Sequence, residues 1–464
     1  MLYRSTRGRA PAVSFQDALL AGLAPDGGLY MPDAWPALRL GPDAGFADVA
    51  AAVTAAFTGP EADLPALTAM ARAAYAGFDD PAVAPLRRLG DDHWLLELFH
   101  GPTLAFKDVA MQLLARLFDA ALASGGSRVA IIGATSGDTG AAAIDAFRTA
   151  EQADIYILHP KGRVSEVQRR IMTSVREDNV VNIAVDGSFD DCQAVVKALF
   201  ADRPFAEEMR LGGVNSINWA RLAIQITYYA TSLRALAPVA PRVSFSVPTG
   251  NFGDVFAGYA AKRMGLGVDR LCVAVNDNDI LHRVLTSGRY APATVSATTS
   301  PSMDIQVASN FERLVFEASG RDAGGTVDFV RAVDDPGGAR LDDPRLAAMR
   351  ADFVSERARG EEVADMMRRM ADEHSILVDP HTAVGLVATE KARADGRLDG
   401  PVVTLSTAHA AKFPDAVRAA TGRTPDLPDR FADLYDRPER FVEAAASPAA
   451  IQDVMRRHRA ERRA

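Results

Sequence analysis

One lysine in this chain has neighbours that could make it reactive. Lys107 follows the turn Gly101-Pro102 and stands beside Phe106, where a helical pattern of apolar residues begins. Burial among apolar side chains disfavours the charged form of a lysine, so its pKa falls and a neutral amine becomes available. Such an amine can form a Schiff base with a carbonyl compound. The alternative is an ordinary lysine in the first turn of a helix, which is the commoner case for a lysine taken alone.

Two glycine-rich turns downstream would suit anions. Each follows a short apolar segment and precedes a helical pattern, at residues 133–140 and 248–254. Free backbone amides and the positive end of a helix dipole make such a turn an anion site. The first turn adds hydroxyl groups and would suit a carboxylate, whereas the second offers successive amides and would suit a phosphate. A tight strand-to-helix turn capped by Asp138 or Asp254 explains either turn equally well.

A third segment ends a predicted strand with hydroxyl groups. Residues 404–409 read Thr-Leu-Ser-Thr-Ala-His, and a hydroxyl group there could meet a ring nitrogen of a cofactor. His409 could act as a base, although a histidine at a strand end is more often a structural hydrogen-bonding group. The chain has no His-Glu-x-x-His, Cys-x-x-Cys or Gly-x-Ser-x-Gly pattern. The sequence therefore disfavours metal hydrolases and serine hydrolases, and we expect no metal site.

The composition is that of a globular protein. The 464 residues suffice for two to four domains, and 48% of them are hydrophobic and 24% charged. The formal net charge of −9 gives no electrostatic reason to expect nucleic acid or an anionic membrane as a partner. Two cysteines in a chain of this length are typical of a reducing cytosol, and no apolar run approaches the length of a membrane span. We expect a soluble cytoplasmic protein with no obligate protein partner.

The elements that would position these groups alternate between strands and helices. Predicted strands cover residues 128–132, 155–158, 180–185, 243–247, 271–275 and 402–406. Predicted helices cover residues 141–149, 164–175, 190–201, 219–236, 255–264 and 279–286. This alternation predicts an α/β protein whose parallel sheets carry helices on both faces. We expect a mainly helical region at residues 1–90, a smaller α/β domain with the lysine segment at 91–236 and a larger α/β domain at 237–464.

Four segments taken together resemble those of threonine synthases. They are residues 99–108, 135–140, 248–254 and 405–414, in the same order as in that family. Residues 3–8 and 27–32 resemble the longer-chain branch of the family. The resemblance covers nearly the whole chain and implies a fold of the tryptophan-synthase β type, known as fold type II. One departure is Ala410, where many relatives have proline.

The resemblance implies a pyridoxal-phosphate enzyme that converts O-phospho-L-homoserine and water to L-threonine and phosphate, the last step of threonine biosynthesis. Carried over by position, Lys107 would hold the cofactor as a Schiff base, and Thr407 would bond its ring nitrogen. The cofactor phosphate would lie among Gly250, Asn251, Phe252, Gly253 and Asp254. The groups facing the substrate carboxylate and amine, or the cofactor ring hydroxyl, would be Thr135, Ser136, Asp138 and Thr139. Related enzymes often have asparagine in place of Asp138.

The phosphate group of the substrate needs cationic or amide partners of its own. The best candidates are Asn215 and Arg221, because residues 213–221 open a long helical pattern. Four further side chains could serve, namely Lys161, Arg163, Asn310 and Arg313. An ordinary surface charge is the alternative for each of them.

Three other functions fit the same residues. A lyase with the same cofactor would release 2-oxobutyrate instead of adding water. A regulatory homologue could keep the fold and lose turnover, although Lys107 and all three loops are intact. An unrelated α/β protein could bind phosphate esters without pyridoxal phosphate. A visible spectrum and an analysis of the products separate these three from the main prediction.

Overall fold

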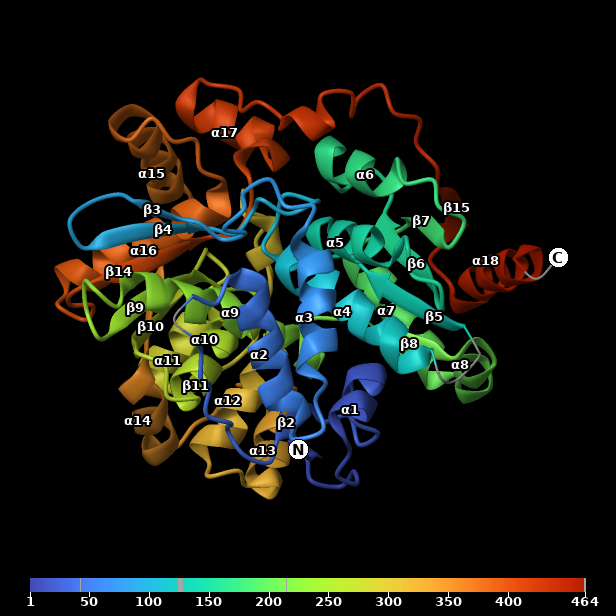
Figure 1. The fold of residues 1–464 in the computed structure, drawn as a ribbon, viewed down its shortest axis with the longest axis horizontal. Helices are drawn as coiled ribbons and strands as arrows, with labels where there is room; N and C mark the ends of the chain where they lie inside the picture. The colour runs from blue at the N-terminus through green and yellow to red at the C-terminus, as the bar shows by residue number, and fades with distance from the viewer. Residues whose placement is uncertain (42, 124–127, 214, 463–464) are drawn as a thin grey trace.

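Two larger sheets and two short antiparallel strand pairs form the framework of the molecule. The structure is a computed structural model, and it describes residues 1–41, 43–123, 128–213 and 215–462. The six-stranded sheet lies to the left of the centre in Figure 1 and the five-stranded sheet to the right. The short pairs are β1 (Tyr3–Ser5) with β2 (Tyr30–Pro32), and β11 (Arg289–Tyr290) with β12 (Ala339–Arg340).

The five-stranded sheet is parallel throughout. Its strand order is β15 (Val442–Ala445), β7 (Val180–Asp186), β6 (Ala153–Pro160), β5 (Val129–Ala134) and β8 (Leu211–Gly213). Every residue of β6 is buried, because alternate side chains face helices on opposite sides of the sheet. One face packs on α4 (Lys107–Leu122), α5 (Asp138–Phe147) and α6 (Glu166–Thr173). The other packs on α7 (Phe189–Ala201), α8 (Arg203–Met209) and α18 (Pro448–Glu461).

The six-stranded sheet is parallel except at one edge, where β3 runs antiparallel to β4. Its strand order is β13 (Phe353–Arg357), β10 (Val268–Val275), β9 (Val243–Pro248), β14 (Val402–Ser406), β4 (His93–Glu97) and β3 (Leu86–Arg88). One face packs on α9 (Trp219–Leu236) and α10 (Gly253–Arg263). The other packs on α15 (Gly360–Glu373) and α16 (Pro380–Ala394).

The amino-terminal part of the chain shares the core of the larger sheet. It contains α1 (Phe15–Ala21), α2 (Phe46–Thr58) and α3 (Leu64–Tyr75). The hydroxyl group of Tyr3 donates to the carbonyl oxygen of Phe57 at 2.7 Å, and the ring of Trp219 packs on both side chains. The remaining helices are α11 (Ile280–Ser287), α12 (Phe311–Ala318), α13 (Ala323–Ala332), α14 (Asp343–Asp352) and α17 (Pro414–Thr421).

The predicted fold class is confirmed, and the differences lie in single elements. Helix α9 and strand β14 have the predicted bounds. Helix α5 begins at Asp138 and not at the predicted residue 141, because the chain turns sharply at Gly137, where φ is +140°. Strands β4, β13 and β15 were not predicted, and the region at residues 1–90 contains β1, β2 and β3 in addition to its helices.

Both sheets draw strands from distant parts of the chain. Residues 91–236, predicted to form the smaller domain, also supply β4 to the six-stranded sheet. Residues 237–464, predicted to form the larger domain, also supply β15 to the five-stranded sheet. The division into three domains at residues 90 and 236 stays a prediction.

Three chemical features of the described residues bear on function. No helix among them is long and apolar enough to cross a membrane. No group of three or more histidine, cysteine, aspartate or glutamate side chains in the described ranges could hold a metal ion. Cys192 and Cys272 are both free thiols, and both are buried.

Candidate active site

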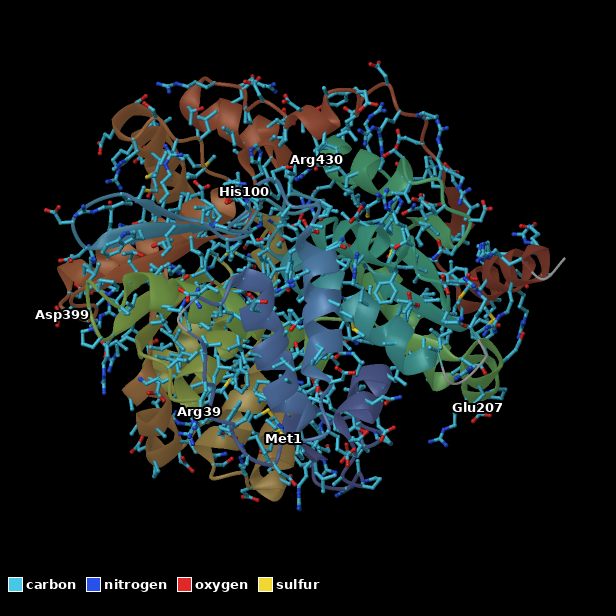
Figure 2. The ribbon with its side chains drawn as sticks, viewed as in Figure 1. Met1, Arg39, His100, Glu207, Asp399 and Arg430 are labelled. Carbon is cyan, nitrogen blue, oxygen red and sulfur yellow. The ribbon has the colours of Figure 1, made fainter. Side chains whose placement is uncertain are left out.

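Lys107 is the first residue of α4, at the end of a loop that is held firmly in place. The carboxylate of Asp108 accepts hydrogen bonds from the backbone amide of Thr103 at 2.8 Å and from its hydroxyl group at 2.6 Å. A side chain at Gly101 would clash, since a Cβ there would lie 2.4 Å from the Cβ of Asp108. Arg430, on the segment that crosses above the loop in Figure 2, donates to the carbonyl oxygen of Gly101. The loop is therefore fixed before the lysine starts the helix.

The same loop runs beside the end of β14. The amide of Phe106 donates to the carbonyl oxygen of Thr407 at 2.9 Å, and the amide of His409 donates to that of Leu104 at 3.0 Å. Leu104 has a φ of +62°, a left-handed conformation that costs a bulky residue on the order of 1–3 kcal/mol. These contacts place Thr407 next to the lysine loop, although the two are far apart in the sequence.

Lys107 is buried, as its apolar neighbours predict. Its Nζ lies 4.7 Å from the centroid of the Phe106 ring and 3.1 Å from Oδ2 of Asp138. Burial lowers the pKa of Lys107; the charge of Asp138 opposes this shift, and the charges of Lys412 and Arg221 add to it. The first turn of a helix also disfavours a cation, because the helix dipole is positive there. The position therefore favours a neutral amine.

Asp138 lies between two lysines. Its Oδ2 faces Lys107, and its Oδ1 forms an ion pair with Nζ of Lys412 at 2.5 Å. Gln168 Nε2 donates to Oδ1 at 2.8 Å, and the hydroxyl group of Ser302 donates to Oδ2 at 3.3 Å. Although burial alone would raise it, the interactions with the two lysines hold the pKa of Asp138 well below its usual range. Asp138 is therefore ionised at neutral pH.

Three of these partners were not singled out from the sequence, namely Lys412, Gln168 and Ser302. Lys412 lies within residues 405–414, one of the segments that carry the resemblance, and its side chain is fully buried. The signal that could have found it is a lysine in an otherwise apolar stretch after a buried strand, since a buried lysine has to be paired. Its partner could not be identified, because Asp138 belongs to the other sheet.

The first glycine-rich turn is closed by one of the predicted substrate residues. The hydroxyl oxygen of Thr135 accepts hydrogen bonds from the amides of Gly137 at 2.9 Å and Gly140 at 2.8 Å. Thr135 is itself buried, so its hydroxyl group shapes the turn. Ser136 and Thr139 are half-buried, and among the described residues none bonds to their hydroxyl groups. These two hydroxyl groups and the carboxylate of Asp138 are the side-chain polar groups that the turn can offer to a ligand.

The second glycine-rich turn offers backbone amides. Among the described residues none accepts a hydrogen bond from the amides of Gly250, Asn251 or Phe252. Helix α10 begins at Gly253 with no side-chain cap at Phe252, which has a φ of +63°. The side chain of Asn251 is occupied within the protein, because it donates to the hydroxyl group of Ser216. The turn therefore presents amides at the positive end of a helix, the arrangement that binds phosphate.

The carboxylate of Asp254 bonds to two tyrosines instead of serving as a simple helix cap. Its Oδ1 accepts hydrogen bonds from the hydroxyl groups of Tyr228 at 2.5 Å and Tyr229 at 2.9 Å. Burial raises the pKa of Asp254 to about 6, against the two tyrosine hydrogen bonds that lower it. Arg221 is buried nearby, and burial lowers its pKa to about 10. The hydrogen bonds to the two tyrosines therefore hold Asp254 against α9.

The histidine after β14 has a structural role. Nδ1 of His409 accepts a hydrogen bond from the amide of Ala411 at 3.2 Å, and burial lowers the pKa of His409 to about 4. The hydroxyl group of Thr407, which stands two residues earlier, bonds to no other described residue. Thr407 is therefore the better placed of the two residues to bond a ligand.

The other predicted phosphate ligands lie in different settings. Asn215 is exposed, in the turn before α9. Lys161 is exposed and pairs with Glu443 at 2.8 Å. Arg313 is fully buried, and its guanidinium donates to backbone carbonyl oxygens of Tyr30 and Ile217. Arg313 therefore holds backbone segments together.

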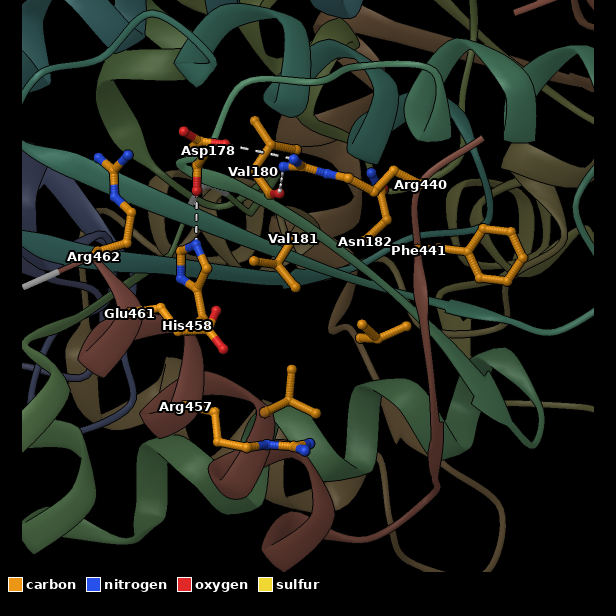
Figure 3. Close-up of a pocket in the computed structure, with 12 residues that line it drawn as sticks. Asp178, Val180, Val181, Asn182, Arg440, Phe441, Arg457, His458, Glu461 and Arg462 are labelled. Carbon is orange, nitrogen blue, oxygen red and sulfur yellow. Dashed lines mark hydrogen bonds and ion pairs between the residues drawn. The ribbon is translucent and has the colours of Figure 1, made fainter. Parts of the chain in front are cut away.

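A pocket of about 520 Å³ lies elsewhere, between β7, β15 and α18 (Figure 3). Its charged lining residues are Asp178, Arg440, Arg457, Glu461 and Arg462. Most of these groups already have partners in the protein: Arg440, for example, donates to the carbonyl oxygens of Glu177 and Val180. None of the predicted site residues lines this pocket, so it is separate from the candidate active site.

The described residues around Lys107 fit pyridoxal phosphate. The buried amine of Lys107 can react with an aldehyde, and the amides of residues 250–252 can receive a phosphate. A Cβ at Gly250 would lie 2.6 Å from the carbonyl oxygen of Ser302, so only glycine fits where the chain approaches the site. The hydroxyl group of Thr407 can reach a ring nitrogen. The donor set is that of a cofactor with an aldehyde, a phosphate and a heteroaromatic ring.

Replacing Gly250 with alanine is expected to weaken cofactor binding tenfold to a hundredfold. The added Cβ would displace Ser302, and overpacking of this kind costs about 1–3 kcal/mol. The measurement is a titration of the cofactor-free protein with pyridoxal phosphate, followed by absorbance. Gly77→Ala is the control, because a Cβ there would meet nothing within 4 Å. Equal dissociation constants for Gly250→Ala and the unaltered protein would contradict the prediction.

Comparisons with known proteins match this chain to threonine synthases along nearly its whole length. Residues 2–75 match the family described as "Threonine synthase N terminus", residues 81–340 match "Pyridoxal-phosphate dependent enzyme", and residues 382–455 match "Threonine synthase, C-terminal". A threonine synthase of Pseudomonas aeruginosa is 47% identical over 99% of this chain and 98% of its own. One of Corynebacterium glutamicum is 43% identical over 94% of each chain.

Solved structures agree with the sequence relatives. The pyridoxal-phosphate-bound threonine synthase of Brucella melitensis superposes with a TM-score of 0.94 at 49% identity, over 99% of both chains. The yeast threonine synthase superposes with a TM-score of 0.92 at 36% identity, again over 99% of both chains. The prediction of a fold type II pyridoxal-phosphate protein is thereby confirmed.

Proposed function

Because the chain belongs to the threonine synthase family, we propose that it converts O-phospho-L-homoserine and water to L-threonine and inorganic phosphate. In chemical class this is a carbon–oxygen lyase that acts on a phosphate ester and depends on pyridoxal phosphate. The observation that carries the proposal is the buried amine of Lys107, held 3.1 Å from Asp138 beside a turn with free amides. This arrangement lies within a chain that matches threonine synthases almost from end to end.

Each part of the cofactor has a proposed partner. Lys107 would hold the aldehyde carbon, and the amides of residues 250–253 would hold the phosphate at the start of α10. Thr407 would bond the ring nitrogen through its hydroxyl group. A neutral hydroxyl partner leaves that nitrogen less protonated than a carboxylate partner would. Bound in this way, pyridoxal phosphate supplies an acceptor for the electrons released when protons leave the substrate.

The amine of Lys107 moves the protons. In its neutral form it accepts the proton from Cα of the substrate, and once it has passed that proton on it can accept one from Cβ, so that the phosphate can leave from Cγ. A proton then returns to Cγ, a water molecule adds its oxygen to Cβ and gives the hydroxyl group of threonine, and a proton finally returns to Cα. Burial of Lys107 favours this role, because an amine that is neutral near pH 7 can both accept and return a proton.

The substrate would be oriented by the first turn and by the start of α9. Ser136 and Thr139 offer hydroxyl groups to its carboxylate. Asp138 offers a negative charge to its amino group. Arg221 would bind the phosphate, together with Asn215. Supply of the substrate requires an enzyme that phosphorylates the side-chain hydroxyl group of homoserine.

A comparison of two substrates tests the proposal. The protein is incubated with O-phospho-L-homoserine or with L-homoserine, and amino-acid products are identified by chromatography. Threonine is expected from the phosphorylated compound alone, since hydroxide is a far poorer leaving group than phosphate. Equal threonine formation from both compounds, or from neither, would exclude the proposed reaction. The cytoplasmic location and the absence of an obligate partner stay predictions from the composition.

Replacing Arg221 with alanine is expected to raise KM for O-phospho-L-homoserine about tenfold to a hundredfold. A charge-assisted hydrogen bond to phosphate contributes about 1.5–3 kcal/mol, and its loss should affect KM more than kcat. Steady-state kinetics give both constants. Arg234→Ala is the control, because Arg234 stands in the last turn of the same helix. An unchanged KM in Arg221→Ala would remove this residue from the substrate site.

A further inference from the structure

Two buried lysines share a single carboxylate at this site. Nζ of Lys412 lies 2.5 Å from Oδ1 of Asp138, and Nζ of Lys107 lies 3.1 Å from Oδ2. The side chain of Lys412 is fully buried and that of Lys107 is 10% exposed. Burying an ammonium group without a counter-ion costs several kcal/mol, so one carboxylate can balance only one of these two cations.

The contacts show which of the two lysines is better held as a cation. Lys412 has the shorter contact with Asp138, and it also donates to the carbonyl oxygen of Thr103 at 2.9 Å. Among the described residues, Lys107 has only the longer contact and the face of the Phe106 ring. It also stands at the positive end of α4, where a cation is disfavoured. Lys412 is therefore the better paired of the two lysines.

We propose that Lys412 is a positioning residue that keeps Asp138 engaged as its counter-ion, so that Lys107 gives up its proton and presents a free amine. The proposal rests on the role of Lys107 given above. Lys412 does not touch the cofactor or the substrate in this account, and it acts through Asp138. The amine freed in this way is the one that reacts with the aldehyde of pyridoxal phosphate.

The other charged groups around Lys107 do not replace Asp138 as the carboxylate in contact with its amine. Arg221, from α9, is a further cation in range of the amine. The carboxyl group of Asp254, from α10, is within electrostatic range of Lys107, but it accepts hydrogen bonds from two tyrosines. His381, from α16, is within electrostatic range of Asp138, and its own Nδ1 lies 2.7 Å from Oδ2 of Asp379. Asp138 is thus the only carboxylate in direct contact with Lys107 among the described residues.

The position of Lys412 in the fold explains why it can act in this way. It belongs to the short 3₁₀ helix η2 (Ala410–Lys412), just after β14 of the six-stranded sheet, whereas Asp138 follows β5 of the five-stranded sheet. A second contact joins the same two parts, since the hydroxyl group of Ser165 donates to the carbonyl oxygen of Lys412 at 3.3 Å. Lys412 therefore holds Asp138, which follows a strand of the five-stranded sheet, at the lysine loop beside the six-stranded sheet.

The test measures the pH at which Lys107 becomes reactive. The full chain, prepared free of pyridoxal phosphate, is treated briefly with acetic anhydride over a range of pH, and acetylation of each lysine is quantified by mass spectrometry. Lys412→Met removes the charge and keeps the length of the side chain, whereas Lys412→Arg keeps the charge. Exposed Lys197 on α7 serves as the internal reference in every sample.

In Lys412→Met, Asp138 is left to pair with Lys107 alone. The midpoint for acetylation of Lys107 is expected to rise by about one pH unit, which makes Lys107 about tenfold less reactive at pH 7. Lys412→Arg is expected to restore most of the reactivity. An unchanged midpoint in Lys412→Met, even with a lower melting temperature, would overturn the proposal and leave Lys412 a structural residue.

A second variant keeps the proposal testable if Lys412→Met does not fold. In Asp138→Asn the charge of Lys412 is unopposed, so the midpoint of Lys107 is expected to fall. A midpoint that rises or stays in place would also overturn the proposal. Because acetylation requires no turnover, this outcome is independent of whether the protein makes threonine.

Discussion

Replacing Lys107 with alanine is expected to lower kcat by roughly 10⁴-fold or more, because the residue both holds the cofactor and moves the substrate protons. Proton transfer by a positioned group alone contributes about 10²–10⁴-fold, and loss of the covalent anchor adds to this. The fold should survive, since Asp138 retains Lys412 as its counter-ion. Single-turnover assays with added pyridoxal phosphate measure the effect, and the melting temperature reports on the fold.

Lys197→Ala is the matched control for this experiment. Lys197 is exposed on α7, so its removal should leave kcat and the visible spectrum unchanged. The Lys107→Ala protein should also lose the absorbance of a covalently held cofactor. Normal turnover by Lys107→Ala would contradict every role assigned to the site.

Replacing Asp138 with alanine is expected to destabilise the protein by about 3–5 kcal/mol, because the buried ammonium group of Lys412 loses its counter-ion. Asp365→Ala should cost far less, since Asp365 forms an exposed pair with Arg368, and such pairs contribute about 0–1 kcal/mol. Chemical denaturation at pH 7 measures both variants. A loss below 1 kcal/mol for Asp138→Ala would show that Lys412 does not depend on this carboxylate.

The effect of Asp138 on stability has a definite pH dependence. Its folded pKa lies well below the usual range of an aspartate, so the ionised carboxylate stabilises the fold at all pH values above its unfolded pKa. That contribution is lost as the pH falls through the folded pKa. The part of the stability difference that comes from titration of Asp138 itself should therefore be constant above about pH 4 and shrink below it.

The amino-acid sequence is enough to predict elements whose signals are local. Helix α9 was predicted with its observed bounds, because a long apolar pattern follows Asn218, which caps its first turn. Strand β14 was predicted as closely, since a run of apolar and β-branched residues lies between Pro401 and Thr407. Strand β4 was missed because only Trp94, Leu95 and Leu96 form its apolar part, a run too short to be distinguished.

The candidate site was predictable in its parts but not in its contacts. Each loop carries a local signal, whether glycines, hydroxyl groups or a lysine beside apolar residues. The ion pair of Asp138 with Lys412 joins the ends of two strands in different sheets, and no pattern in the sequence shows that these ends meet. The same holds for Asp254, whose tyrosine partners lie on α9.

The measurement that tests the account most directly is the stoichiometry of the products from O-phospho-L-homoserine. The purified protein with pyridoxal phosphate is incubated with this compound, and phosphate, threonine and 2-oxobutyrate are quantified over time. Equal amounts of phosphate and threonine are expected, with no 2-oxobutyrate. Phosphate accompanied by 2-oxobutyrate would assign the site to elimination without addition of water, and no phosphate at all would contradict the proposed reaction.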